Sequence, residues 1–336
     1  MKNDEFTMKK LLKKGLKAIL PLIGGGCIMA WIYWDFDFSK VGDIMLHEMN
    51  WWWMIISLCF GVFSHIVRGL RWKLALAPLG AYPRTANCIN AIFLAYAANL
   101  VLPRLGELSR CGVLSKYDHV SFSKSLGTVV TERLIDSLCV LLVTAVAFAS
   151  QMPVFNEFFL ETGTDIDSYM YIFTSMQFYI VVLCVVSILV LLYYIFRTLS
   201  FFEKVKGVVL NVWEGIISLK NVRNLPLFIL YTILIWFFYF MQFYVTFYCF
   251  SFTFDLGVLA GLVLFVAGSV AVVVPTPNGA GPWHFAIISM MIIYGVNAAD
   301  AGIFALIVHG IQTFLLILLG IYATAVLPII NKKQNL

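Results

Sequence analysis

One segment of the sequence limits what the surrounding chain can form. Residues Val272–His284 read VVVPTPNGAGPWH and separate two strongly apolar runs. Three of these residues are proline and two are glycine. Because proline lacks a backbone donor and glycine leaves helical geometry at little cost, we expect no helix to continue through the segment.

The composition makes this interruption informative. Hydrophobic residues make up 61% of the chain and charged residues 12%, which indicates an all-α integral membrane protein and not a soluble domain. In hydrocarbon, broken backbone is tolerated only where it is buried in protein or lines a watery cavity. The segment is therefore a candidate functional site.

The remaining composition excludes other classes of function. The net charge of +5 does not indicate a nucleic-acid partner, because the basic residues lie in short loops where they set membrane orientation. The seven cysteines show no metal-ligand spacing, and no nucleotide-binding loop is present. We expect no metal, no cofactor and no hydrolysis of ATP by the chain.

The distribution of charge predicts a topology. Basic residues precede the first apolar run and fill residues 68–84, whereas acidic residues dominate 35–50 and 151–171. Because basic loops remain in the cytoplasm, we expect both termini inside, in the plasma (inner) membrane of a prokaryote. Six full spans are predicted, at about 18–34, 52–70, 125–150, 171–196, 225–250 and 302–328.

Two further apolar stretches do not fit this topology as spans. Residues 85–102 lie between a cytoplasmic loop and an outward-leading span, and they end in the proline and glycine break LPRLGELSR. The other stretch is a pair of apolar arms, 257–274 and 283–295, which the proline and glycine segment near residue 280 separates. The second arm is too short to cross the membrane alone. We expect two re-entrant broken-helix elements that enter from opposite sides.

This arrangement divides a single transmembrane domain, residues 1–336, into two inverted halves. Each half, 1–150 and 151–336, supplies two helices, a broken element and a long closing helix. Paired broken segments in inverted halves are typical of secondary transporters, in which the substrate site lies where the breaks meet.

Basic residues converge at the end of the second predicted span. His65, Arg68 and Arg71 fall on one helical face. For Arg71 and Lys73, snorkelling toward the cytoplasmic surface is at least as good an interpretation as a functional one. For Arg68, which lies deeper, we favour a functional position.

Ionisable residues also surround the first break along the chain. Arg104, Glu107 and Arg110 recur at spacing three, which predicts a carboxylate between two guanidinium groups on one helical face. Such a set at membrane depth is expensive unless it is paired or wet.

A second ionisable set, Glu132, Arg133 and Asp136, lies near the start of the following span. In one interpretation, the arginines of both sets bind a lipid phosphate while the carboxylates hold them or bind a coupling proton. In the other, the charges form a static network that fixes the broken element to the span. The two interpretations are compatible, and both stay open.

The second break carries candidates of a different kind. Pro282 suits the first position of a helix, whose N-terminal N–H groups attract anions, and Asn278 and His284 are candidate substrate-binding residues there. A lone histidine such as His284 more often satisfies a loop carbonyl. His309 and Gln312, three apart on the last span, are expected to form an interhelical hydrogen bond, with cavity lining as the alternative.

Four motifs occur in the order RGLRW, LPRLGELSR, TERLID and PTPNGAGPWH. Together they resemble the flippase-like transmembrane region of the lysylphosphatidylglycerol synthetases and their stand-alone relatives, over nearly the whole chain. Members often carry a glutamate shortly after the last motif, where this chain has Trp283 and His284. No aminoacyl-transfer domain precedes the end at Leu336, so we expect no synthesis of aminoacyl lipid.

We therefore expect the chain to flip an anionic amphiphile, a phospholipid or a polyprenyl-phosphate-linked lipid, through a polar cavity between the two broken elements. The alternatives are an intramembrane transferase that modifies a lipid headgroup and a membrane scaffold for a lipid-modifying enzyme. Neither the lipid nor the oligomeric state follows from the sequence. The candidate substrate-binding residues are Arg68, Arg104, Glu107, Arg110, Glu132, Arg133, Asp136, Asn278 and His284.

Overall fold

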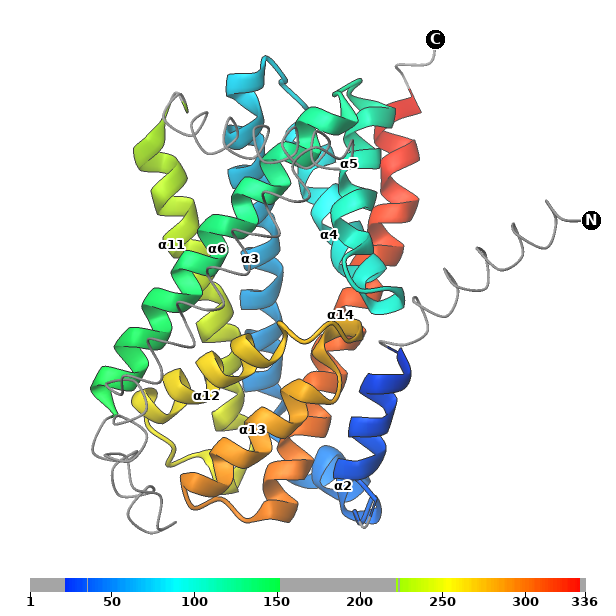
Figure 1. Cartoon of the computed structure of the whole chain (residues 1–336). Coiled ribbons are helices and arrows are strands. Elements are labelled where there is room, and N and C mark those ends of the chain that lie inside the picture. The colour runs from blue at the N-terminus through cyan, green and yellow to red at the C-terminus, as the bar shows by residue number, and fades with distance from the viewer. Residues whose placement is uncertain (1–21, 35, 152–221, 223, 333–336) are drawn as a thin grey trace, which may run out of the picture.

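The computed structural model describes residues 22–34, 36–151, 222 and 224–332 (Figure 1). Every regular element in these residues is a helix, as predicted. An apolar helix, Leu22–Ile32, comes first. The elements that follow are α2 (Ser39–Asp43), η1 (Ile44–Glu48), α3 (Trp51–Leu76), η2 (Ala77–Leu79), α4 (Thr85–Val101), α5 (Leu105–Tyr117), α6 (Phe122–Ser150), α11 (Leu225–Tyr244), η4 (Val245–Cys249), η5 (Ser251–Thr253), α12 (Val258–Ala271), η6 (Pro277–Gly279), α13 (Pro282–Ile293) and α14 (Ala298–Asn331).

Four of these helices are long and apolar enough to cross a membrane, namely α3 with η2, α6, α11 with η4, and α14. They correspond to four of the six predicted spans. The predicted span 171–196 lies outside the described residues, and the predicted span 18–34 is described only from Leu22. The second predicted span was placed too short, because its helix continues past residue 70 to Leu76 with Trp72 and Leu76 buried.

Asparagine side chains determine where three of the long helices begin. Asn50 accepts a hydrogen bond from the amide of Trp52 before α3, and Asn297 accepts one from Ala299 before α14. Asn224 does the same for α11. Each side chain satisfies a backbone donor that would otherwise have no partner in the first helical turn.

The predicted break after residue 101 is confirmed. Helix α4 ends at Val101, and α5 begins at Leu105 after a left-handed residue, Arg104, with φ of 67°. The two helices pack against each other as a hairpin in the upper part of the molecule as drawn in Figure 1. Re-entrant insertion of this pair into a bilayer stays a prediction.

The second predicted break is also confirmed. Helix α12 ends at Ala271, and the chain then takes positive φ values at Asn278, Gly279 and Gly281 before Pro282 starts α13. The α12–α13 pair occupies the lower part of the molecule in Figure 1, opposite the α4–α5 pair. Because η6 contacts α4, the two breaks approach each other inside the bundle.

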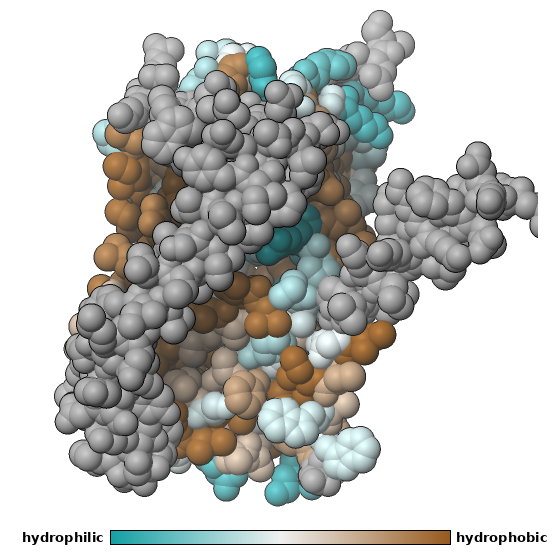
Figure 2. All heavy atoms as spheres, in the orientation of Figure 1, coloured by the Kyte–Doolittle hydropathy of each residue, from teal (hydrophilic) through white to brown (hydrophobic). Residues whose placement is uncertain are grey.

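The long helices alternate in direction around these pairs. In Figure 1, α3 and α14 run upward while α6 and α11 run downward. The described surface is apolar along the sides and more hydrophilic at both ends, and a strongly hydrophilic spot interrupts it at mid-height (Figure 2). This distribution fits a membrane protein with a polar interior at one depth.

Small residues allow α4 to approach two neighbours closely. A Cβ at Gly106 of α5 would lie 2.2 Å from the carbonyl oxygen of Ala95, and one at Gly320 of α14 would lie 2.2 Å from the Cβ of Ala97. Helix α4 is therefore held between α5 and α14 by packing that tolerates no side chain at either glycine.

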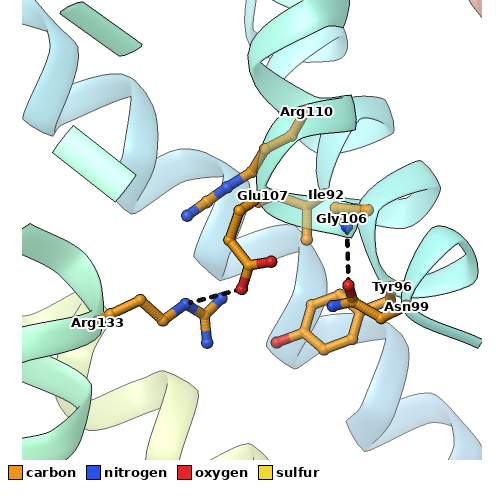
Figure 3. A pocket seen from close by; sticks show the side chains of 8 residues that line it. Ile92, Tyr96, Asn99, Gly106, Glu107, Arg110 and Arg133 are labelled. Carbon is orange, nitrogen blue, oxygen red and sulfur yellow. Dashed lines mark hydrogen bonds and ion pairs between the residues drawn. The ribbon is translucent and has the colours of Figure 1, made fainter. Parts of the chain in front are cut away.

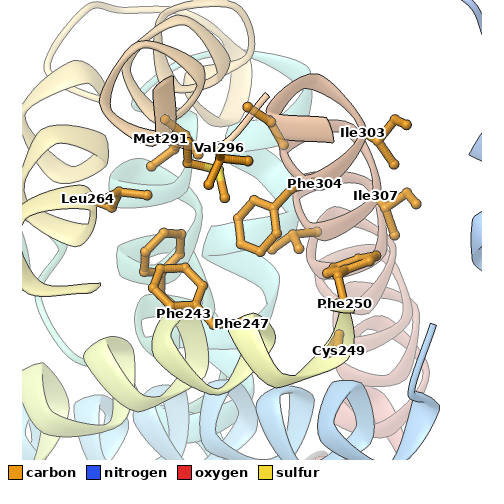
Figure 4. Close-up of a cluster of buried hydrophobic side chains, with 14 of the residues drawn as sticks. Phe243, Phe247, Cys249, Phe250, Leu264, Met291, Val296, Ile303, Phe304 and Ile307 are labelled. Atoms are coloured by element: carbon orange, nitrogen blue, oxygen red, sulfur yellow. The ribbon is translucent and has the colours of Figure 1, made fainter. Parts of the chain in front are cut away.

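An apolar core holds the lower half together. Aromatic residues of α11 and the segment after it, Phe243, Phe247 and Phe250, pack against Phe304 of α14 (Figure 4). Leu264 of α12 and residues of α13 complete this cluster. The α12–α13 pair is thus anchored by hydrophobic contacts to the helices on either side.

We expect Gly106→Ala to lower the apparent melting temperature of the purified protein, because the added methyl overlaps the Ala95 carbonyl. Overpacking of this kind costs about 1–3 kcal/mol. Gly112→Ala, also in α5 but with nothing within 4 Å of its Cβ, is the control and should hold or raise the melting temperature through helix propensity. Equal behaviour of the two variants would contradict the close packing.

Cysteine labelling tests the insertion of the two pairs. In a variant without native cysteines, Tyr82→Cys and His119→Cys flank the α4–α5 pair, and Asp255→Cys and Ala298→Cys flank the α12–α13 pair. We expect a membrane-impermeant maleimide to reach positions 82 and 119 from one side and positions 255 and 298 from the other. Labelling of 82 and 119 from opposite sides would show that α4–α5 crosses the membrane.

Candidate functional site

The charged residues of α3 and α6 meet in the interior. Asp136 accepts hydrogen bonds from Arg68 Nη1 at 2.6 Å and from Arg71 Nη2 at 2.9 Å, and all three side chains are buried. The expectation that Arg71 snorkels is therefore wrong. Its guanidinium is fully buried because a carboxylate on the neighbouring helix compensates its charge, as an intramembrane arginine requires.

Glu132 extends the network by one helical turn. Its Oε2 accepts a hydrogen bond from Arg110 Nη1 at 2.8 Å, and its Oε1 lies 3.4 Å from Arg71 Nε. The spacing of four between Glu132 and Asp136 places both carboxylates on the same face of α6. Arg71 contacts both of them, so the network joins α3, α5 and α6.

Aromatic and hydroxyl groups enclose the arginines. The Arg110 guanidinium lies 4.7 Å from the ring centre of Trp72, whose indole donates to Thr128 Oγ1 at 3.0 Å. The Arg71 guanidinium donates to Thr232 of α11 at 3.3 Å. These contacts stabilise cations in a site from which water is excluded.

A small cavity lies at one edge of the network, under the α4–α5 break (Figure 3). Its volume of about 10 Å³ is room for about one water molecule. Across it, Glu107 Oε1 and Arg133 Nε face each other at 3.6 Å. The cavity is lined by Ile92, Ala95, Tyr96, Asn99, Gly106, Glu107, Arg110 and Arg133.

Two of the unsaturated groups of the network belong to residues that line the cavity. Arg110 Nη2 and Glu107 Oε2 are buried and have no hydrogen-bond partner among the described residues. The Arg133 side chain is 45% exposed, whereas those of Arg68 and Arg71 are at most 3% exposed. Free donors and a half-exposed guanidinium can therefore meet an incoming group here.

Counted over the described residues, the network also holds one positive charge in excess. A buried net charge is unfavourable in a medium of low dielectric constant, so an anion that reached the cavity would be stabilised. The network consists of four arginines, Arg68, Arg71, Arg110 and Arg133, and three carboxylates, Glu107, Glu132 and Asp136.

The structure corrects the predicted arrangement of Arg104, Glu107 and Arg110. Arg104 precedes α5 in a left-handed conformation and is exposed, so the three residues do not share one helical face. Within the described part of the chain, Arg104 forms no ion pair, while Glu107 pairs with Arg133 and Arg110 with Glu132. The turn at Pro103 and Arg104 moves the first helical residue to Leu105, which leaves Arg104 outside the helix.

The candidates at the second break form a separate, uncharged group. The Asn278 side chain donates to Thr313 Oγ1 at 2.8 Å. The backbone carbonyl oxygen of Asn278 lies 3.1 Å from His309 Nε2, so the expected hydrogen bond of His309 joins α14 to η6. His284 Nδ1 accepts from the amide of Gly281 at 3.4 Å instead of donating to a carbonyl. Gln312 Nε2 has no partner in the described residues.

Sequence reasoning missed several cavity residues. Asn99 of α4 accepts a hydrogen bond from the Gly106 amide at 2.7 Å and so holds the hairpin closed. Tyr96 lies three residues earlier, and its hydroxyl is 2.5 Å from that of Tyr239 on α11. The available signal was two polar residues at spacing three in the second, mostly apolar half of the helix.

No group of histidine, cysteine and carboxylate side chains suited to a metal ion occurs in the described ranges. The acids of the site are instead engaged by arginines. What the site offers is a cationic, hydrogen-bonding environment in the interior of a helical membrane domain.

A sequence model of the lysylphosphatidylglycerol synthase transmembrane region matches residues 18–320. The chain belongs to this family. The match spans both helix pairs and every residue of the ionic network. Searches of curated proteins and of solved structures gave no match. Membership in the lysylphosphatidylglycerol synthase transmembrane family makes the chain a multi-pass membrane domain related to lipid handling.

For this family member we expect Asp136→Asn to be strongly destabilising, because it leaves Arg68 and Arg71 buried without their shared carboxylate. Removing one partner of a buried ion pair costs about 3–5 kcal/mol. Arg133→Gln, at a half-exposed position, should cost about 1 kcal/mol or less. Thermal unfolding in detergent measures both, and similar losses for the two variants would contradict this division.

Proposed function

We propose that the chain moves an anionic amphiphile, a phospholipid or a polyprenyl-phosphate-linked lipid, between the leaflets of a bilayer. The observation that carries the proposal is the excess positive charge of the buried network, whose unsaturated groups face the cavity under the α4–α5 break. Family membership supports it, because the matching region is a membrane domain related to lipid handling.

The network divides into a fixed and an accessible part. Arg68 and Arg71 are held by Asp136 and have little exposed surface. They contribute positive charge to the site, but they are not the first groups that the substrate contacts. Arg133 and the free Nη2 of Arg110 form the accessible part. A lipid phosphate binds there through the planar guanidinium groups, which match its oxygens.

Entry of a headgroup requires a movement. The cavity has room for about one water molecule, so a phosphate enters only when the facing pair of Glu107 and Arg133 separates. That pair is long at 3.6 Å and partly exposed, so little energy holds it closed. The phosphate then replaces the Glu107 carboxylate as the partner of Arg133.

The remaining path runs between the two broken pairs. In this proposal α4–α5 and α12–α13 are re-entrant elements of inverted halves, and the headgroup passes where η6 meets α4. The lipid tails stay in hydrocarbon. Arg104 at the tip of the first break, and Asn278 and His284 at the second, contact the headgroup before and after the central network.

The proposal includes no covalent step and places the protein in a prokaryotic plasma membrane with both termini cytoplasmic. The transferase alternative needs a free general base. Its candidate bases are Glu107 and Glu132. Glu132 is held by ion pairs to Arg71 and Arg110, whereas Glu107 keeps one oxygen without a hydrogen-bond partner among the described residues. The scaffold alternative requires no polar interior at all.

A translocation assay tests the function. Purified protein is reconstituted into vesicles that contain fluorescent phosphatidylglycerol or phosphatidylcholine, and movement of the labelled headgroup is followed by chemical quenching from outside. We expect the wild type to accelerate flipping of the anionic lipid. Arg133→Gln should slow it by about 10- to 100-fold, which corresponds to one charge-assisted hydrogen bond of about 1.5–3 kcal/mol.

Lys116→Gln is the matched control, because Lys116 is an exposed cation on α5 that does not line the cavity. It should flip lipid at the wild-type rate. Arg133→Lys should recover only part of the activity, since an ammonium group lacks the planar fork. Equal rates for wild type and Arg133→Gln would exclude the cavity from the transport path.

A further inference from the structure

Two buried histidines meet at the second break, away from the ionic network. The ring centres of His284 on α13 and His309 on α14 are 4.6 Å apart and the ring planes are inclined by 71°. His284 is 1% exposed. The Trp283 ring covers His309 at 5.0 Å. The central ionic network makes no use of this pair.

The two rings are hydrogen-bonded in opposite senses. His284 Nδ1 accepts from the Gly281 amide, so this nitrogen carries no proton. His309 Nε2 lies 3.1 Å from the Asn278 backbone carbonyl oxygen and 3.4 Å from Asn278 Nδ2, and a bond to the carbonyl requires a proton on Nε2. Both contacts are met when the two rings are neutral, and each ring holds one end of the segment between η6 and α13.

Within the described part of the chain, no charged side chain contacts the pair to stabilise an imidazolium ion. The elements packed around the pair are the helix Leu22–Ile32, α4, α11, α12 and α14. Among them only α14 carries an ionised side chain within its helix, Asp300, which lies nine residues before His309. The phenol of Tyr33, 5.9 Å from the His284 ring, is the titratable group in contact.

We propose that His284 and His309 together form a binding site for a single proton, and that its occupancy is coupled to passage of the headgroup. Two imidazolium rings at 4.6 Å repel each other, so uptake of a second proton is strongly disfavoured. The coupling part of this proposal rests on the proposed function, whereas proton binding by the pair does not.

The position of the proton changes the backbone contacts of the break. A proton on His309 Nδ1 leaves its bond to the Asn278 carbonyl in place and strengthens it. A proton on His284 Nδ1 removes the acceptor of the Gly281 amide and frees the start of α13. Transfer between the rings therefore switches the N-terminus of α13 between a held and a released state.

This switch lies next to the transport path. Asn278, whose carbonyl contacts His309, belongs to η6, and η6 contacts α4 of the first pair. Release of α13 at Gly281 therefore loosens η6, the segment that contacts α4. Proton uptake and headgroup movement then share one structural element, which is the requirement for coupling.

Histidine ¹⁵N NMR of protein in nanodiscs tests proton binding directly. The chain has five histidines, and the exposed His47 and His119 provide internal references. We expect the resonances of His284 and His309 to change over different pH ranges in the wild type. In His284→Asn, whose amide oxygen still accepts from Gly281, the midpoint pH of His309 should rise because the repelling ring is gone.

Two NMR results overturn the site: no titration of either ring between the pH limits at which the protein stays folded, or a midpoint of His309 that is unchanged in His284→Asn. The reciprocal variant is His309→Gln, whose amide group still donates to the Asn278 carbonyl. Thermal unfolding of both variants verifies that the fold is retained, so that a changed midpoint reports on the pair.

The vesicle assay, repeated with a pH difference of one unit across the membrane, tests coupling. One proton per lipid corresponds to a steady-state ratio of up to about ten between the leaflets. We expect the wild type to show this asymmetry and His309→Gln to flip lipid without it. Arg133→Gln should flip lipid about 10- to 100-fold more slowly at any pH, which separates failure of the transport site from failure of the proton site. An asymmetry that persists in His309→Gln overturns the coupling.

Discussion

The structure depends on compensation of buried arginines by carboxylates. Arg68 and Arg71 lie in the interior of a membrane domain, where an unpaired guanidinium would cost several kcal/mol. Asp136 and Glu132 make their burial possible, and in doing so they fix α6 against α3 and α5. This set of ion pairs determines the positions of the helices around the cavity more than apolar packing does. Apolar side chains gain little from leaving lipid for protein, because lipid tails are just as apolar.

The two breaks use different chemistry. The first lies beside an ionic network with a positive excess, and its cavity retains a free donor and a free acceptor. The second contains two imidazoles that bond to backbone and an asparagine that donates to a threonine hydroxyl. The interior of the protein is therefore asymmetric, with charged groups at one break and titratable rings at the other, even though both breaks separate a pair of helices.

The breaks and the long helices could be predicted from the sequence because proline, glycine and apolar run length act locally. The spacing of Glu132 and Asp136 likewise gave a shared helical face. Partners across elements could not be predicted in this way. Nothing local distinguishes Arg71, which is buried on Asp136, from a snorkelling arginine, and the left-handed turn at Arg104 displaced a residue that simple spacing placed on α5. Tyr96 and Asn99 became site residues only because α5 folds back on α4.

The close packing at Gly106 and Gly320 has a mechanical consequence. Because α4 is clamped between α5 and α14 by backbone contact, these three helices can move only as one body. Helix α6 has the smallest buried share of the four long helices, yet it carries Glu132 and Asp136. Of the cations that these carboxylates bind, Arg68 and Arg71 lie on α3 and Arg110 lies on α5. Displacement of α6 alone would separate Arg68, Arg71 and Arg110 from Glu132 and Asp136, so these two carboxylates act as resident competitors that an entering phosphate replaces.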